Sequence, residues 1–355
     1  MATAARSLLY PTLLDVAKRT DPDGKIAAIA ELLSEMNPIL ADAVWKEGNL
    51  PIGERCTVRT GLPSSYWRLL NQAVPASTSK TAQVDEGCGM LEAWGIVDKD
   101  LAELNGNTAA FRLSEAIAQM EGMNQTMATA MFYGNASTNP EQFNGLDVRF
   151  NSTAAANKNN LVLAGDGSAA VNQDIWLVVW SPNTAYCIYP KGSKAGITHQ
   201  DLGEQTIYTT SNVAGGAATG QYRAYQDHWQ WKCGLVVKDW RYVARVCNIN
   251  VTALHSNSSA ADINRCMVSA THRIWNLNAG RAAWYMSRTL AEHMDLQSRA
   301  GVSGSPLVAM NGSFGTQQPG GNSQLESFQG ERVLSFRGIP IRVCDTIVTS
   351  ANKVS

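Results

Sequence analysis

The sequence predicts an α+β protein, because one long helical pattern stands beside several separate stretches of strand-forming residues. The helical pattern covers residues 107–134, where apolar side chains recur every three or four positions. The continuous apolar run Ile175–Trp180 has the length of a buried strand. Residues 222–250 are rich in β-branched and aromatic side chains. At 355 residues the chain can bury a sizeable core, which we expect to be divided into roughly two or three lobes.

The chain opens with a predicted arm that ends in a short helix. Asp21-Pro22 is a helix start signal, with Asp as the N-cap and Pro at the first helical position, and Asn37-Pro38 stops the helix. An apolar stripe follows the start signal and consists of Ile26, Ile29, Leu32, Leu33 and Met36. Such an amphipathic helix needs a surface to lie on, in the same subunit or in a neighbour.

The next segment predicts a long two-stranded excursion. Cys56–Pro63 mixes β-branched and turn residues, Pro75–Thr81 is expected to be a small polar tip, and Thr81–Met90 is the returning strand. A two-stranded ribbon is only marginally stable alone, so it should rest on another surface. An ordinary surface hairpin is the alternative interpretation.

Residues 107–134 predict one long amphipathic helix of about 26 residues, or roughly 39 Å. Asn107 can cap its first turn, and Gly134 can close the helix in the left-handed conformation. The residues expected on its core face are Leu113, Ile117, Met120, Met123 and Met127, with Met131 continuing the stripe. Taken alone, such a helix would also suit the core of an ordinary α+β enzyme.

The second half of the chain alternates loops with further elements. Residues 151–167 and 213–220 read as loops, and residues 301–330 as a loop region or weak hairpin. Residues 262–280 and 281–297 predict two helices, although the second segment could also begin as a strand. Val333–Ile347 predicts a pair of strands around Gly338.

Composition constrains the function classes. Charged residues make up only 17% of the chain, well below the usual quarter. Ten Trp and ten Tyr fit either a surface covered by other subunits or a large aromatic core. A net charge of −1 without a basic run argues against binding nucleic acid through its phosphates.

The sequence also predicts a location. The first ten residues lack the apolar core of a signal peptide, and no apolar run reaches the roughly 20 residues of a membrane span. We therefore expect synthesis in a cytoplasm and no membrane association. Seven Cys without a C-x-x-C pair predict reduced thiols rather than disulfides or a zinc site.

The sequence predicts no catalytic, cofactor or metal site. It has no phosphate-binding G-x-x-x-x-G-K-[ST] and no G-x-S-x-G nucleophile elbow, and its five His are scattered. Asp85, Glu86 and Glu92 could pair for acid–base chemistry, but neighbouring carboxylates are common on solvated segments. Asp166 is a single acidic residue, far short of a calcium loop.

Three phrases of the sequence resemble a known family. The first begins with Met131-Phe-Tyr-Gly-Asn, continues with Pro140-Glu-Gln-Phe and ends at Gly145-Leu146. The others are Gly234–Ile249 and the closing aromatic-x-Gly-x-Pro phrase from Phe336. Together and in this order they resemble major capsid proteins of tailed bacteriophages with the HK97-like fold, especially those of short-tailed phages.

The resemblance implies an α+β subunit with an N-terminal arm, an extended β-hairpin loop, a long spine helix, and peripheral and axial lobes. The implied division is 1–44 as the arm, 45–94 as the extended loop, 95–174 as the peripheral domain with the spine helix, 175–330 as the axial domain with part of the peripheral domain, and 331–355 as C-terminal strands returning to the peripheral domain. In this family the extended loop lies across the neighbouring subunit, so Trp67, Leu69 and Leu70 are expected intersubunit contacts.

The implied function is self-assembly as pentamers and hexamers into an icosahedral head that encloses double-stranded DNA without reading its sequence. A separate scaffolding protein, a portal and a decoration or cement protein are the further partners that the resemblance suggests. The chain begins directly with the arm, so a scaffold is expected to be a separate protein or a segment already removed. Lysine–asparagine crosslinking, which occurs in part of the family, is not carried over to Lys80. The rival interpretation is a soluble enzyme or carbohydrate-binding module.

Overall fold

The computed structural model describes residues 34–165, 171–210, 219–256, 261–300, 323–328 and 331–347, together with residues 11, 351, 353 and 354. The predicted arm helix up to Leu33, Asp166, most of the predicted loop at 213–220 and all of residues 301–322 lie outside this set. The chain divides into two compact units. One unit holds residues 90–127 and 196–232 together with 1–35, and the other holds 36–89, 128–195 and 233–355.

The first unit is built on a long antiparallel hairpin. Strands β8 (Ile197–Thr209) and β9 (Gly220–Val237) pair from Ile197 opposite Trp231 to Thr209 opposite Gly220. Strand β4 (Gly89–Asp98) lies on the other side of β9. Helix α3 (Lys99–Ala102) then leads toward α4, and Asp98 caps α3 by accepting a hydrogen bond from the Asp100 backbone N–H at 2.9 Å.

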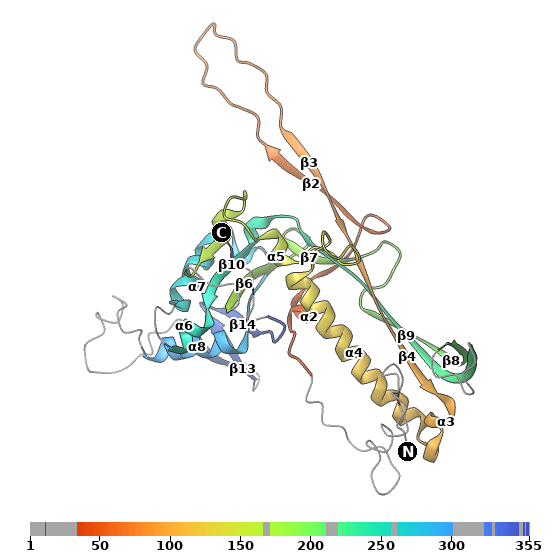
Figure 1. The fold of residues 1–355 in the computed structure, drawn as a ribbon. Coiled ribbons are helices and arrows are strands. Elements are labelled where there is room, and N and C mark those ends of the chain that lie inside the picture. Colours follow the sequence, from red (N-terminus) through yellow and green to blue (C-terminus); the bar gives the residue numbers. More distant parts are fainter. Residues whose placement is uncertain are drawn as a thin grey trace. The chain divides into compact units, whose positions relative to one another are not determined.

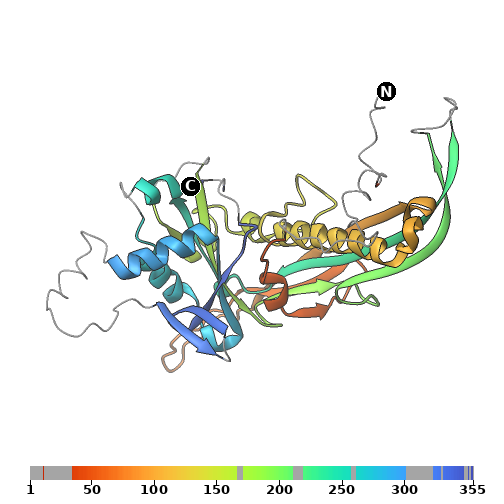
Figure 2. The same cartoon turned by 90° about the horizontal axis from the view of Figure 1, so that it is seen from below.

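Helix α4 (Thr108–Tyr133) has 26 residues, which confirms the predicted long helix. Figure 2 shows it as one uninterrupted helix. In the first unit, Phe111 of α4 packs with Val97 and Ala102 in a small apolar core. Arg112, one residue further along, reaches the β8–β9 hairpin, where it contacts Asp201 at 2.7 Å and Asp227 at 2.9 Å.

The second unit is organised around β6 (Asn172–Trp180), every residue of which is buried. Side chains alternate along a strand, so Ile175, Leu177 and Val179 share one face with each other and Trp176 and Trp180 share the opposite face. Both faces are covered, which explains why this strand has a continuous apolar sequence. The predicted buried strand is confirmed.

Around β6 the second unit forms a mixed sheet. The neighbours of β6 are β10 (Val243–Asn250) and β11 (Arg281–Met286), both antiparallel, and β7 (Ala185–Tyr189), which is parallel. The outer strands are β1 (Trp45–Glu47), β5 (Leu161–Leu163), β12 (Ser323–Phe328), β13 (Glu331–Phe336) and β14 (Ile339–Val343).

The shorter helices of the second unit are α2 (Ile39–Asp42), α5 (Leu146–Arg149), α6 (Val251–Ser256), α7 (Ile263–Arg273) and α8 (Arg288–Ala300). Helices α7 and α8 supply Met267 and Met294 to the apolar core on the Ile175 face of the sheet (Figure 1). On the other face, the rings of Phe132 and Trp176 lie 6.5 Å apart, and Trp180 Nε1 donates to the Tyr285 hydroxyl at 2.8 Å.

Several expectations for the second half of the chain need correction. The predicted 262–280 helix ends at Arg273, and residues 281–297 begin as strand β11, the alternative that the sequence left open. Residues 151–167 are not entirely loop, because Leu161–Leu163 forms β5 beside β10. The closing strand pair is confirmed: Arg337 and Gly338 have φ of 53° and 77°, the two positive values that a tight hairpin turn requires.

Gly134 ends α4, but not in the predicted left-handed conformation, since it is absent from the positive-φ positions of the described residues. Its role is close backbone approach. A Cβ atom at Gly134 would lie 2.5 Å from the Ala130 carbonyl oxygen, and one at Gly145 would lie 2.7 Å from the same oxygen. The Gly145 N–H donates to the Gly134 carbonyl at 2.8 Å, so both glycines allow the chain after α4 to fold back onto the helix end.

A buried ion cluster ties β10, β6 and α5 together. Arg245 of β10 is completely buried and contacts Asp174 of β6 and Asp147 of α5, each at 2.6 Å. Its guanidinium also donates to the Phe150 carbonyl at 2.7 Å and lies 4.9 Å from the centre of the Trp176 ring. Burial raises the pKa of Asp174 to about 6, although Arg245 acts in the opposite direction.

Candidate assembly surface

A two-stranded ribbon stands out as the candidate interaction element. Strands β2 (Gly53–Gly61) and β3 (Lys80–Gly87) pair antiparallel with each other and form a sheet of their own. Residues 62–79 continue beyond the strands as an open loop (Figure 1). The ribbon is narrower than the predicted range 45–94, because β1 pairs with β7 and β4 lies beside β9.

The loop reverses at an apolar sequence. Asn71 adopts the left-handed conformation with a φ of 67°, which Asn tolerates better than most residues, and a turn forms at Leu70–Asn71. Pro75–Thr81, predicted to be a polar tip, instead lies on the returning segment. The side chains of Trp67, Leu69 and Leu70 at the reversal are 104%, 70% and 92% exposed.

The loop makes few contacts that would hold it to the rest of its unit. Its described hydrogen bonds include one from the Ser77 hydroxyl to the Ser64 carbonyl at 2.9 Å and one from the Gln72 N–H to the Leu69 carbonyl at 3.2 Å. Between Cys56 and Val84 the chain carries Arg59, Arg68 and Lys80 and no acidic residue. The end of the ribbon is therefore apolar and positively charged.

Two carboxylates fix the root of the ribbon. Glu54 and Glu86 are directly opposite each other in the β2–β3 register, and both are buried. Glu54 accepts hydrogen bonds from Lys46 Nζ at 2.8 Å and from the Tyr186 hydroxyl at 2.9 Å. Burial raises the pKa of Tyr186, with hydrogen bonds to Cys56 and Glu54 acting in the same direction, so the hydroxyl remains a donor.

Glu86 pairs with Arg149 of α5 in a two-point contact. Arg149 Nη2 lies 2.8 Å from Glu86 Oε2, and Nη1 lies 2.5 Å from Oε1. The same Nη2 also donates to the carbonyl oxygens of Leu235 and Asn144 at 2.9 and 3.1 Å. The guanidinium thus connects β3 to β9 and to the turn before α5, and its planar geometry fixes the direction in which the ribbon leaves.

The neighbouring pair on the ribbon is solvated. Arg55 and Asp85 form a two-point contact at 2.6 and 2.7 Å, and the pKa of Asp85 is lowered by this hydrogen bonding. Both side chains are about half exposed, at 49% and 54%. Such a pair contributes little to stability, so the ribbon is held mainly by its two buried glutamates.

The predicted core stripe of α4 is divided. Met123 and Met127 are buried, whereas Leu113, Ile117 and Met120 are 60%, 41% and 39% exposed. This corrects the prediction of a continuous core face over these five residues. At the start of α4, Phe111 lies on the side of the helix that faces the core. The predicted spacing of the apolar stripe is therefore right, but the side chains of its first half are exposed.

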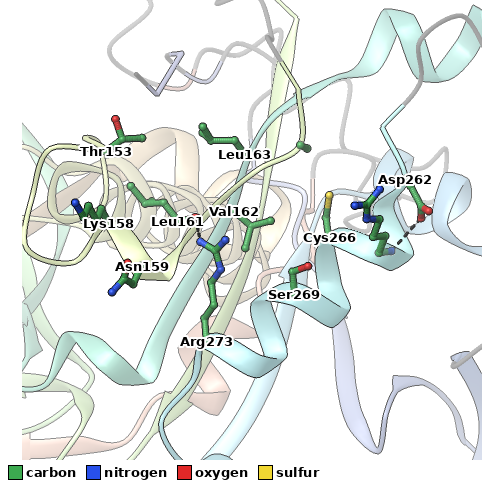
Figure 3. A pocket seen from close by; sticks show the side chains of 12 residues that line it. Thr153, Lys158, Asn159, Leu161, Val162, Leu163, Asp262, Cys266, Ser269 and Arg273 are labelled. Carbon is green, nitrogen blue, oxygen red and sulfur yellow. Dashed lines mark hydrogen bonds between the residues drawn. The ribbon is translucent and has the colours of Figure 1, made fainter.

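A shallow groove of about 670 Å³ lies between α7 and residues 153–164. Figure 3 shows Arg273 reaching from α7 to the Leu161 carbonyl, to which it donates a hydrogen bond. Asp262 caps α7 by accepting from the Arg265 N–H at 2.9 Å. Burial raises the pKa of Cys266 to about 11, so its thiol is protonated near neutral pH. The Cys266 thiol that lines this groove is therefore not activated as a nucleophile.

Comparison with known proteins decides the family. The family model for major capsid protein GP7 matches residues 21–355. The chain belongs to this family of major capsid proteins. A solved structure of the bacteriophage Epsilon15 particle contains a chain that is 31% identical, covering 100% of the present chain and 99% of the Epsilon15 chain, with a TM-score of 0.74. Among curated proteins no sequence matches.

Two further solved structures are more distant from this capsid protein. A chain from the capsid of a native GTA particle is 11% identical with a TM-score of 0.41, and covers 69% of this chain and 99% of its own. One from Mycobacterium phage Adephagia is 11% identical with a TM-score of 0.39, and covers 66% and 97%. The capsid protein has the HK97-like fold that the resemblance implied.

The sequence of the capsid protein did not reveal the roles of Glu54, Glu86 and Arg149. Asp85 and Glu86 look equivalent in the sequence, but one faces solvent and the other is buried. The alternation of side chains along a strand was the available signal, since two adjacent residues of one strand point to opposite faces.

The described helices of the capsid protein include none long and apolar enough to cross a membrane.

Proposed function

We propose that the capsid protein assembles as pentamers and hexamers into an icosahedral head, and that its ribbon is an intersubunit clasp. Trp67, Leu69 and Leu70 of one subunit lie on the surface of a neighbour in the assembled shell. The observation that carries this proposal is an exposed apolar loop end on a ribbon whose root is fixed by the ion contacts of two buried glutamates.

The loop end has the composition of an interface centre. Fully burying one large apolar side chain stabilises by about 1.5–3 kcal/mol, and these three side chains are largely unburied in the single chain. Aromatic and Arg residues are enriched at such centres, and Tyr66 and Arg68 flank Trp67 here. Burial by a neighbour would therefore contribute several kcal/mol to each contact, repeated around every ring.

The remaining parts of the proposal follow from the family and the charge. The head encloses double-stranded DNA without gripping it, in agreement with the net charge of −1. The division into arm, extended loop, peripheral and axial domains is carried over to the subunit, with the extended loop narrowed to residues 53–87. Assembly in the host cytoplasm, a separate scaffolding protein, a portal and a decoration protein complete the proposed context.

Shortening the loop tests the clasp. Residues 62–79 are replaced by Asn-Gly, a two-residue turn that joins Gly61 to Lys80, which face each other in the register. The unassembled chain should keep its melting temperature to within about 2 °C, because the removed residues contribute almost nothing to its core. Electron microscopy of the expressed product should show no closed shells.

A pair of point variants supplies the matched control. Trp67→Ala with Leu70→Ala should weaken assembly strongly, whereas Thr78→Ala with Ser79→Ala on the same exposed loop should assemble normally. Normal shells from the shortened chain would show that the loop is not the clasp. A full-length chain that stays monomeric under all conditions and binds a glycan would instead support the rival binding-module interpretation.

A further inference from the structure

Two histidines from separate helices lie side by side in the second unit. His255 is in the last turn of α6, and His293 is in α8. Their facing nitrogens, Nδ1 of His255 and Nε2 of His293, are 3.2 Å apart. The residues are 38 positions apart in the sequence, so their spacing gave no sign that they would meet. The fold therefore brings together two ring nitrogens that no local motif connects.

The apolar core fixes the two helices that carry this pair. Leu254 and Met294, each next to one of the histidines in the sequence, are buried in the core on the Ile175 face of the sheet. Helix α6 follows β10 and α8 follows β11, and both strands pair with β6. His255 itself is exposed and His293 is half-buried. The backbone positions are thus fixed by packing, while the paired nitrogens remain accessible from solvent.

The separation of the two nitrogens is that of two ligands on one metal ion. Zinc–nitrogen distances are about 2.0–2.1 Å, so at the tetrahedral angle two such nitrogens lie about 3.3–3.4 Å apart. The observed 3.2 Å is close to that value. The ring centres are 4.8 Å apart and the ring planes make an angle of 68°, so the rings meet at an angle and not end to end. A small rotation of each ring would direct both lone pairs at one ion.

The two imidazoles can supply those lone pairs near neutral pH. A ring nitrogen binds a metal only in the neutral form of the ring. Burial and the neighbouring His255 lower the pKa of His293, while Glu292 acts in the opposite direction. Without metal, one facing nitrogen donates its hydrogen to the other. A metal ion takes the place of that hydrogen, and the proton moves to the other nitrogen of the same ring, so both rings remain neutral.

We propose that His255 and His293 bind one divalent transition-metal ion, such as Zn²⁺, which links α6 to α8. Imidazole nitrogen suits zinc, copper and nickel, whereas Mg²⁺ and Ca²⁺ prefer oxygen ligands. Among the described residues no third His, Cys, Asp or Glu joins the pair, so water completes the coordination. An ion that binds only the folded chain stabilises it, and here it would do so within each subunit, independently of the contacts between subunits.

Calorimetric titration of the full-length, unassembled chain with ZnCl₂ tests the site, with MgCl₂ as the ion that should not bind there. His255→Asn and His293→Gln each keep a polar side chain but remove the ligand nitrogen. Each should weaken zinc binding at least about tenfold, because even the loss of a residue that only orients a ligand typically costs that much. His272→Ala is the matched control, since it removes an exposed histidine of α7 that contacts Arg337 instead of a second histidine. It should bind zinc as the unaltered chain does.

Chemical modification of the unaltered chain gives a second readout that needs no variant. Diethyl pyrocarbonate reacts with neutral imidazoles, and ZnCl₂ at about 100 times its Kd should slow the reaction at His255 and His293 at least about tenfold. The rate at His272 should not change, as mass spectrometry of the peptides would show. Equal zinc binding by all the variants, or equal modification rates with and without zinc, would overturn the proposal. A chain that binds no zinc would also overturn it and leave the pair as a hydrogen bond alone.

Discussion

Single residues show best how this protein uses charge in its interior. Arg245 is completely buried, and its two acidic partners come from different elements, β6 and α5. A buried cation costs several kcal/mol in lost hydration unless its partners and hydrogen-bond acceptors are well placed. The Phe150 carbonyl and the Trp176 ring complete that arrangement.

Removing Arg245 should therefore cost more than removing one of its partners. Arg245→Met leaves Asp174 and Asp147 without a cation and should lower the free energy of unfolding by about 3–5 kcal/mol. Asp174→Asn keeps the contact of Arg245 with Asp147 and should cost clearly less. Urea unfolding of both variants measures this order, and an equal or reversed order would contradict the account.

The roles of single residues could be predicted from the sequence only in part. The apolar spacing of α4 identified the stripe from Leu113 to Met127, but periodicity does not show where along a helix the covering layer ends. Gly134 and Gly145 were recognisable as part of a turn, yet their role is mutual backbone approach, which depends on contacts made only after folding. Glu54 and Glu86 carried no signal beyond their alternation on a strand.

At the scale of elements, the ribbon depends on its root. Glu86 is buried and paired with Arg149, whereas the adjacent Asp85 is half exposed and paired with Arg55. The two positions therefore offer a matched comparison within one strand.

Glu86→Gln should lower the free energy of unfolding by about 2 kcal/mol or more, because it leaves a largely buried guanidinium without its counter-charge. Asp85→Asn should change it by less than about 1 kcal/mol, as is usual for solvated pairs. Chemical denaturation gives both values, and hydrogen exchange should show faster opening of β2 and β3 only in Glu86→Gln. Equal effects of the two substitutions would mean that the buried pair does not fix the root.

Elements with a strong local pattern were predictable, and those set by tertiary contacts were not. The 26-residue helix, β6 and the closing hairpin follow from periodicity, a continuous apolar run and an Arg-Gly turn. Strand β5 lies in an Asn- and Ala-rich stretch and owes its existence to pairing with β10. The sequence analysis did not predict the apolar loop reversal at Asn71, because turns are usually polar and exposed Trp and Leu side chains are unusual there. Exposed apolar side chains are instead expected on a surface that another protein covers.

For the whole molecule, the state of the cysteines gives a further prediction. All seven are free thiols, and burial raises the pKa of Cys88, Cys247 and Cys344 to about 12. Because the reactive thiolate is disfavoured, iodoacetamide at pH 8 should label the native chain at least tenfold more slowly than the urea-unfolded chain. Cys88 and Cys266, which are only partly buried, should react first.

The same shifts fix the direction of a pH effect. A thiol whose pKa is raised on folding contributes stability that is present below its ordinary pKa and is lost as the pH rises toward the folded value. The native chain should therefore lose stability above about pH 9, before any thiol is fully ionised. Unfolding midpoints in urea at pH 7.5 and pH 10 measure this, and a higher midpoint at pH 10 would contradict it. Shells that fall apart on adding a reductant would show that disulfides form after all.

The two glutamates at the ribbon root have a geometric consequence. From Glu54 to Gly61 the strand β2 extends about 23 Å, at roughly 3.3 Å per residue. A tilt of about 5° at the root thus displaces the far end by about 2 Å over that length, half the distance across which two apolar side chains count as touching. A small change of angle at the root therefore becomes a large displacement of the loop end. Residues at the root determine where the loop end makes contact, although they lie far from that contact. Substitutions at the root could therefore prevent the loop end from reaching its contact surface on the next subunit, although every residue of that surface and of the loop end is unchanged.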